Sequence, residues 1–162
     1  MLFAEDARDF RELVRDALQG RGFAVTAVED GVRAVEAFRW STFNVVLTDL
    51  AMPGLNGLQV AKACKRHRPG VKVVVLTGWD LLLEDAECID HGVDMVIAKP
   101  VQIHVLTAAL RQVIHEPAPF QRSSGVLREL SSRPGRTPRA GCGHIIAKAT
   151  ITRMRPPRKT TP

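Results

Sequence analysis

With 162 residues, the chain is long enough for one compact α/β domain but too short for two full-sized ones. Hydrophobic residues make up 45% of it, and no run approaches the roughly 20 apolar residues of a membrane-spanning helix, so we expect no membrane segment. The first residues show no basic region followed by an apolar run, so we expect no secretory leader and a cytoplasmic protein. The three cysteines lack a paired metal-binding spacing and are predicted to be reduced thiols.

The net charge of +6 is unevenly distributed along the chain. Residues 1–116 hold 13 Lys and Arg against 16 Asp and Glu, whereas residues 117–162 hold 10 Lys and Arg against one acid, Glu129. The basic character therefore belongs to the second segment, and we predict a domain at 1–116 followed by a tail at 117–162.

Residues 1–116 alternate between short β-rich runs and segments with helical spacing, which is typical of βα units on a parallel sheet. Five such units are predicted, with helices on both faces of the sheet. In chain order the predicted elements are a strand at 2–4, a helix over 10–18 that stops near Gly20, a strand at 23–28, a helix at 32–38, a strand at 45–48, a helix at 58–64, a strand at 71–76, a helix at 82–89, a strand at 95–98 and a helix at 103–114.

The tail at 117–162 is interrupted by prolines and loses apolar periodicity, so we predict that it is mostly disordered. Residues 126–130 could form a helical turn and residues 145–151 a strand, but neither has enough apolar surface nearby to build a core. Ten basic residues could also contact nucleic-acid phosphates, although we favour an unstructured extension because no recognition helix is visible.

Carboxylates follow two of the predicted strands. In an open parallel sheet, ligands bind beyond the carboxyl ends of the strands where the strand order reverses, and for the order 2-1-3-4-5 this point lies between the first and third strands. Glu5 and Asp6 follow the first strand, and Asp49 follows the third. Three converging carboxylates require a neutralising cation, and their oxygen ligands suit Mg²⁺.

The fourth and fifth strands bring a hydroxyl and an ammonium group to the same edge, from Thr77 and Lys99. Both groups suit a phosphoryl oxygen, and a carboxylate such as Asp49 can act as a nucleophile that forms an aspartyl phosphate. The pattern therefore indicates phosphoryl chemistry centred on Asp49.

From about Leu2 to about Ile114 the chain resembles the response-regulator receiver family. The resemblance is carried by the acidic pair, the Asp-x-x-Met-Pro-x-x-x-Gly segment after the third strand, the Thr after the fourth strand and the Lys-Pro after the fifth: Glu5-Asp6, Asp49 to Gly57 with Met52-Pro53, Thr77 and Lys99-Pro100. It implies a flavodoxin-like, doubly wound, five-stranded parallel sheet of order 2-1-3-4-5.

The resemblance also implies roles. Asp49 is expected to accept a phosphoryl group from a histidine kinase or phosphotransfer protein, with Thr77 and Lys99 contacting that group. Glu5, Asp6, Asp49 and the main-chain carbonyl of Ala51 are expected to hold Mg²⁺. The Lys99-Pro100 bond is expected to be cis, and the protein's chemistry to be limited to its own phosphorylation and dephosphorylation, so that it is not an enzyme.

Two positions depart from the family pattern. Val96 stands where the family usually has an aromatic residue that rotates inward on activation, so we expect a modest conformational response. Glu5 replaces the commoner Asp and should still bind the metal.

Three alternatives remain open. The chain could be the detached carboxy-terminal receiver of a hybrid sensor histidine kinase, which genomic context would reveal. It could be a DNA-binding regulator that acts through the basic tail, in which case deletion of 117–162 would abolish salt-dependent binding. A flavodoxin-like enzyme such as a small phosphatase shares the acidic crevice but lacks the Lys-Pro and Met-Pro motifs.

Overall fold

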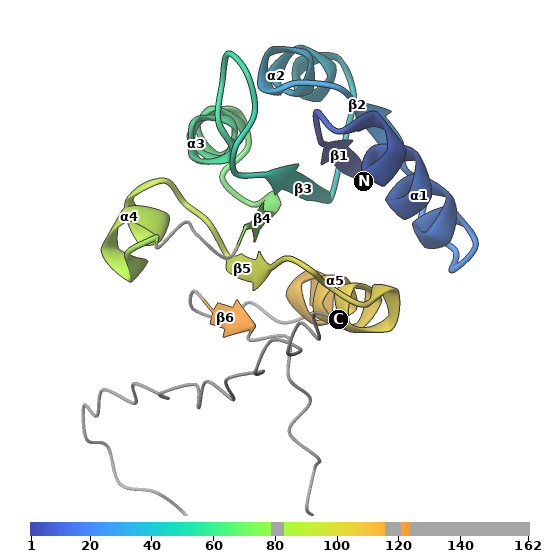
Figure 1. The fold of residues 1–162 in the computed structure, drawn as a ribbon. Helices are drawn as coiled ribbons and strands as arrows, with labels where there is room; N and C mark the ends of the chain where they lie inside the picture. Colours follow the sequence, from blue (N-terminus) through green and yellow to red (C-terminus); the bar gives the residue numbers. More distant parts are fainter. Residues whose placement is uncertain (79–82, 116–120, 124–162) are drawn as a thin grey trace, which may run out of the picture. The chain divides into compact units, whose positions relative to one another are not determined.

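The computed structural model describes residues 1–78, 83–115 and 121–123, and a six-stranded parallel sheet runs through them (Figure 1). The strand order is β2-β1-β3-β4-β5-β6. The strands are β1 (Leu2–Ala4), β2 (Thr26–Val28), β3 (Val45–Asp49), β4 (Lys72–Thr77), β5 (Met95–Ala98) and β6 (Gln121–Ser123). The helices are α1 (Arg8–Gln19), α2 (Gly31–Trp40), α3 (Gly57–His67), α4 (Asp85–Asp90) and α5 (Ile103–His115).

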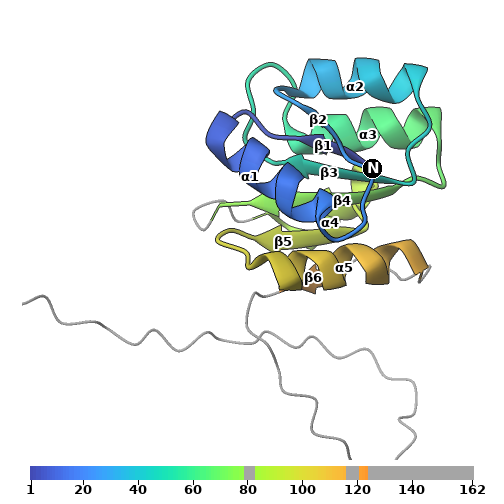
Figure 2. The same ribbon diagram turned by 90° about the vertical axis from the view of Figure 1, so that its right-hand side faces the viewer.

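The helices cover both faces of the sheet, as predicted. Helices α1 and α5 pack on one face, and α2, α3 and α4 lie on the other (Figures 1 and 2). Each face has its own apolar core because the strand side chains alternate between the two sides. The first five strands have the predicted order 2-1-3-4-5. None of the described helices is both long and apolar enough to cross a membrane.

Strand β2 is shorter than the predicted strand at 23–28. Phe23 still belongs to the turn after α1, because its main-chain nitrogen donates to the carbonyl of Leu18 at 3.2 Å. Gly22, in the same turn, adopts a left-handed φ of 86°. Pairing with β1 therefore begins only at Thr26. Phe23 and Val25 still pack against the core, which explains why the apolar pattern started earlier than the strand.

Two details of the predicted helices differ in the structure: the burial of one residue in α1 and the start of α4. Leu13 belongs to the apolar stripe of α1 but is 67% exposed, whereas Phe10, Val14 and Leu18 of the same stripe pack into the core. Helix α4 begins at Asp85, later than the predicted start at 82, and residue 82 itself lies outside the described residues.

Strand β6 lies beyond the domain boundary predicted at residue 116, and the sequence did not predict it. It adds a sixth strand parallel to β5, with Val96 opposite Arg122. The helical turn considered at 126–130 and the strand considered at 145–151 both lie outside the described residues.

The loop after β3 is fixed at both ends by main-chain contacts. Leu50 donates its N–H to Leu76 of β4 at 2.8 Å and accepts one from Gly57 at 2.9 Å. A capping box then starts α3, in which Asn56 and Gln59 each accept a main-chain N–H from the other at 2.9 Å. These bonds hold the loop against the end of β3, where Asp49 lies.

Gly57 is required by space and not by its backbone angles. A Cβ atom built there would lie 2.4 Å from the carbonyl oxygen of Asp49, whereas one at Gly70 would meet nothing within 4 Å. Neither glycine has a positive φ. A side chain at position 57 must therefore displace the main chain of Asp49.

We predict that Gly57→Ala lowers the free energy of unfolding by about 1–3 kcal/mol, because the new methyl group overpacks the end of β3. Gly70→Ala, the matched control, should change it by less than about 0.5 kcal/mol. Urea unfolding followed by circular dichroism measures both. If the two variants had equal free energies of unfolding, the start of α3 would be able to move away from Asp49 without loss of stability.

Candidate functional site

The acidic pair lies at the carboxyl end of β1. Glu5 is only 2% exposed, and its main-chain nitrogen donates to Val28 of β2 at 3.1 Å, whereas Asp6 is exposed. Arg11 of α1 donates Nη1 to the main-chain carbonyls of Glu5 at 2.6 Å and Asp6 at 3.0 Å. The guanidinium thus ties the backbone of the pair to α1 without using either carboxylate.

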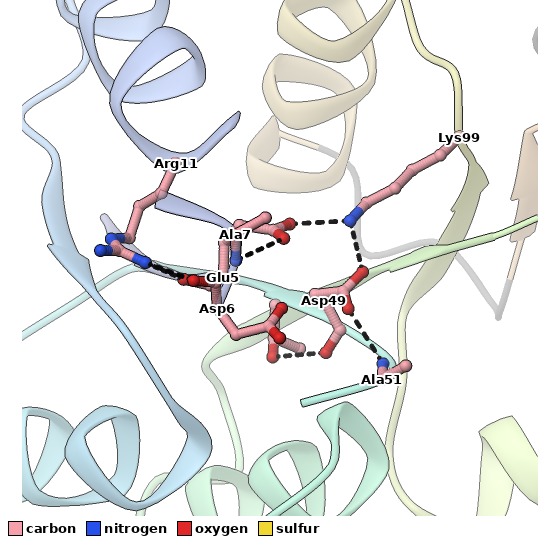
Figure 3. Close-up of polar contacts among 8 residues, drawn as sticks. Glu5, Asp6, Ala7, Arg11, Asp49, Ala51 and Lys99 are labelled. Carbon is pink, nitrogen blue, oxygen red and sulfur yellow. Dashed lines mark hydrogen bonds and ion pairs between the residues drawn. The ribbon is translucent and has the colours of Figure 1, made fainter. Parts of the chain in front are cut away.

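Asp49 ends β3 beside this pair and is 6% exposed. One carboxylate oxygen, Oδ2, accepts the main-chain N–H of Ala51 at 3.0 Å. Glu5, Asp6 and Asp49 each place a carboxylate oxygen within 4.8 Å of the others (Figure 3). The predicted convergence of the three carboxylates is therefore present in the structure.

Lys99 reaches this cluster from one residue beyond β5. Its main-chain nitrogen donates to Thr77 at 2.7 Å, and its Nζ lies 2.7 Å from Glu5 Oε2 and 2.6 Å from Asp49 Oδ1 (Figure 3). The Lys99–Pro100 peptide bond is cis, as expected. The ammonium joins two acids that come from different strands, and the bond to Glu5 spans 94 residues of sequence.

The charges in the cluster shift its pKa values. Burial raises the pKa of Glu5, and nearby Asp49 adds to this effect, although the hydrogen bond and charge of Lys99 oppose it. For Lys99, burial alone would lower the pKa, but the hydrogen bonds and charges of Asp49 and Glu5 outweigh it and raise the pKa. The lysine is therefore charged at neutral pH and acts as the internal counter-ion of the site.

Thr77 lies at the same edge of the sheet. The β3–β4 register pairs Asp49 with Leu76, so Thr77 is one residue beyond the level of the carboxylate. It is 6% exposed, and its hydroxyl donates to the carbonyl of Gly78 at 3.2 Å. A contact between this hydroxyl and a phosphoryl group stays a prediction, as does the role of the Ala51 carbonyl.

The sequence reasoning missed one contact at the site. The ring of Phe10 lies under the ammonium of Lys99, with Nζ 4.7 Å from the ring centroid. Phe10 was predicted only as part of the apolar stripe of α1. Its position four residues after Asp6, in the first turn of the helix, was the feature that could have placed it near the acidic pair.

The donor set fits a divalent cation. Three carboxylate oxygens lie close enough to share one ion, and carboxylates are the hard oxygen ligands that Mg²⁺ prefers. Because Asp6 is exposed, water has access to the cluster and can complete a coordination shell. In the structure, Lys99 supplies the positive charge on the Glu5 and Asp49 side.

Comparison with known sequences places this arrangement in a family. The family model for the response regulator receiver domain matches residues 1–111. The transcriptional regulatory protein CseB of Streptomyces avermitilis is 32% identical over 146 residues, which cover 90% of this chain and 59% of that protein. The chain spans about half the length of the curated relatives that it matches: 59% of the Streptomyces avermitilis protein and 48% of CseB of Streptomyces coelicolor.

Solved structures with the same fold include proteins with bound magnesium. The response regulator TrrA of Thermotoga maritima, in complex with Mg²⁺ and BeF, is 25% identical with a TM-score of 0.64, over 69% of this chain and 96% of that one. The receiver domain of the sensor histidine kinase PA1611 of Pseudomonas aeruginosa, with a magnesium ion in its active-site cleft, is 26% identical with a TM-score of 0.64, over 71% and 96% of the two chains. With the match over 1–111, the parallel sheet and the acidic cluster at its edge, the chain belongs to the response regulator receiver domain family of two-component signal transduction.

Proposed function

We propose that the chain is a phosphorylation-dependent switch whose phosphoacceptor is Asp49. The observation that carries this proposal is the ion pair of 2.6 Å between Asp49 Oδ1 and the ammonium of Lys99, within a cluster of three carboxylates. Receiver domains are signalling switches and not classical enzymes, and we infer that this chain's own chemistry is limited to gaining and losing the phosphoryl group.

The proposed donor is the phosphohistidine of a histidine kinase or phosphotransfer protein. A carboxylate oxygen of Asp49 attacks phosphorus, an O–P bond forms, and the P–N bond to the donor imidazole breaks. The imidazole keeps the bonding electron pair and takes up a proton. Hydrolysis of the acyl phosphate by water then returns Asp49 to its carboxylate and releases inorganic phosphate.

The residues proposed to hold Mg²⁺ are Glu5, Asp6, Asp49 and, through its main-chain carbonyl, Ala51. When bound, the ion would neutralise negative charge on the incoming phosphoryl group. The Arg11 contacts support this role for the acidic pair, because they fix its main chain without using its carboxylates.

Lys99 and Thr77 are proposed to contact the phosphoryl oxygens. Lys99 already lies against Asp49, and Phe10 beneath its ammonium limits the directions in which the side chain can turn. Once Asp49 carries a phosphoryl group, the added negative charge gives Lys99 a stronger partner than the carboxylate alone. The same lysine would thus neutralise the unmodified carboxylates and bind the phosphoryl group once Asp49 carries it.

The first test concerns the phosphoacceptor. Asp49→Asn should abolish the phosphoryl adduct that acetyl phosphate forms in the presence of Mg²⁺, because the amide has nearly the same shape but is not nucleophilic. Asp9→Asn, which removes an exposed acid from the first turn of α1, should be labelled like the wild type. Intact-protein mass spectrometry measures the adduct. Full labelling of Asp49→Asn would move the phosphoacceptor elsewhere.

The second test concerns the metal. Asp6→Asn should weaken Mg²⁺ binding by at least about tenfold, since one of three anionic ligands is lost, while the exposed position preserves the fold. Asp9→Asn again serves as the control of equal charge change. Isothermal titration calorimetry with MgCl₂ gives both dissociation constants, and equal affinities of the two variants would exclude Asp6 as a ligand.

The third test concerns the counter-ion. Without Mg²⁺, Lys99→Met should lower the free energy of unfolding by about 2 kcal/mol or more, because Glu5 and Asp49 lose their cation. The variant should also bind Mg²⁺ more tightly than the wild type, since the ammonium no longer competes for the same oxygens. Urea titrations with and without MgCl₂ measure both effects.

The matched control is Lys62→Met, which breaks an exposed pair with Asp90 in which both side chains are more than 40% exposed. Such a pair contributes only about 0–1 kcal/mol. A Mg²⁺ affinity that stays at the wild-type value in Lys99→Met would show that the lysine and the metal do not share ligands.

A further inference from the structure

The ammonium of Lys99 contacts two carboxylates and one aromatic ring. Its Nζ lies 2.7 Å from Glu5 Oε2 and 2.6 Å from Asp49 Oδ1. The ring belongs to Phe10, and its centroid lies 4.7 Å from Nζ, within the roughly 6 Å over which an aromatic face attracts a cation. Both carboxylates are proposed metal ligands, whereas the ring offers no ligand atom to Mg²⁺.

The two acids that hold Lys99 have a donor on each of their carboxylate oxygens. Besides the lysine, Glu5 accepts the main-chain N–H of Ala7 on Oε1 at 3.3 Å, and Asp49 accepts that of Ala51 on Oδ2 at 3.0 Å. A metal ion that shares these oxygens repels the ammonium, because like charges so close oppose each other strongly in a partly buried site. Metal binding at the proposed site therefore weakens the pairing of Lys99 with the acids.

The ring of Phe10 is held by contacts that do not involve the carboxylates. Phe10 lies in the first turn of α1 and packs against the apolar core on the α1–α5 face of the sheet. The next residue, Arg11, binds the main-chain carbonyls of Glu5 and Asp6 (Figure 3). Because this turn is anchored by the core and by main-chain bonds, a change in the ligands of the carboxylates leaves the ring where it is.

We propose that Phe10 is a positioning residue that keeps Lys99 at the site when Mg²⁺ shares the carboxylate oxygens. It touches no reacting atom and acts through the lysine, whose ammonium it holds within reach of the incoming phosphoryl group. Without the ring, the long lysine side chain gains rotamer freedom that must be lost again during transfer. The effect on transfer rests on the proposed phosphorylation of Asp49, and the proposal adds a residue to that site.

The first arm of the test observes the contact itself by NMR of the full chain with ¹³C-labelled lysine. Protons over the face of an aromatic ring resonate upfield, so the ε-methylene signal of Lys99 reports on the ring, and Lys99→Met identifies this signal by its loss. In the wild type the signal should lie upfield of its position in Phe10→Leu, and it should stay upfield at saturating MgCl₂. If MgCl₂ moves the wild-type signal to the position seen in Phe10→Leu, the ring releases the lysine and the proposal is overturned.

The second arm measures the rate at which the Asp49 adduct forms from acetyl phosphate at saturating MgCl₂. Phe10→Leu should be labelled about three- to tenfold more slowly, the size expected for the loss of one cation–π contact. Phe10→Tyr keeps the ring and should restore both the upfield shift and the rate. The matched control is Phe23→Leu, because Phe23 packs against the same core but its ring lies 6.0 Å from the guanidinium carbon of Arg111. This control should be labelled like the wild type.

The third arm separates positioning of the lysine from a change in the metal ligands. If the ring holds Lys99 both with and without the ion, its contribution cancels, and the dissociation constant for Mg²⁺ in Phe10→Leu should lie within about twofold of the wild-type value. Isothermal titration calorimetry measures it. A dissociation constant that rises as much as the labelling rate falls would show that Phe10 shapes the carboxylate cluster, and the positioning role would be overturned.

Failure of this proposal and failure of the proposed function are distinguishable. If the wild type forms the adduct at Asp49 and Phe10→Leu forms it at the same rate, the positioning role is wrong and the proposed function stands. If the wild type forms no adduct, the proposed function fails together with the role of Phe10 in phosphoryl transfer, even where the lysine signal stays upfield.

Discussion

The structure depends on the way two buried acids on neighbouring strands are neutralised by one lysine. Glu5 and Asp49 lie at the ends of β1 and β3, almost without exposure to water, and charged groups in such places are costly unless they are paired. Lys99 lies within 2.7 Å of both and is itself held by the ring of Phe10. The order of the strands brings these groups together, and the lack of a side chain at Gly57 leaves room for the main chain of Asp49.

Much of this arrangement follows from patterns that are local in the sequence. Continuous apolar runs such as 95–98 are long enough and sufficiently rich in Val and Ile to define central strands, and the observed bounds of β5 agree with the prediction. The carboxyl ends of parallel strands share one edge, so Glu5, Asp6 and Asp49 were expected to meet, and they do. Family resemblance added the cis bond at Lys99–Pro100 and the strand order.

Other features depend on contacts that the sequence pattern does not encode. Phe23 has the same apolar character as a strand residue, yet its N–H is used to close the turn after α1, so β2 starts later. Leu13 fits the helical stripe but is 67% exposed, whereas its neighbour Val14 is buried. Strand β6 contains no apolar residue, so apolar periodicity did not predict it, and its pairing with β5 became visible only in the structure.

The ion pair between Glu5 and Lys99 joins residues that are 94 positions apart, close to the two limits of the family match. Contacts of such separation form late in folding, because the entropy lost in closing a long loop must be spent before the contact contributes any favourable energy. On a ribosome, the acidic pair and Asp49 emerge well before the lysine does. A nascent or truncated chain that ends before residue 99 would hold its carboxylates without their internal cation, so the charge balance of this cluster is complete only once the residue after β5 has been added.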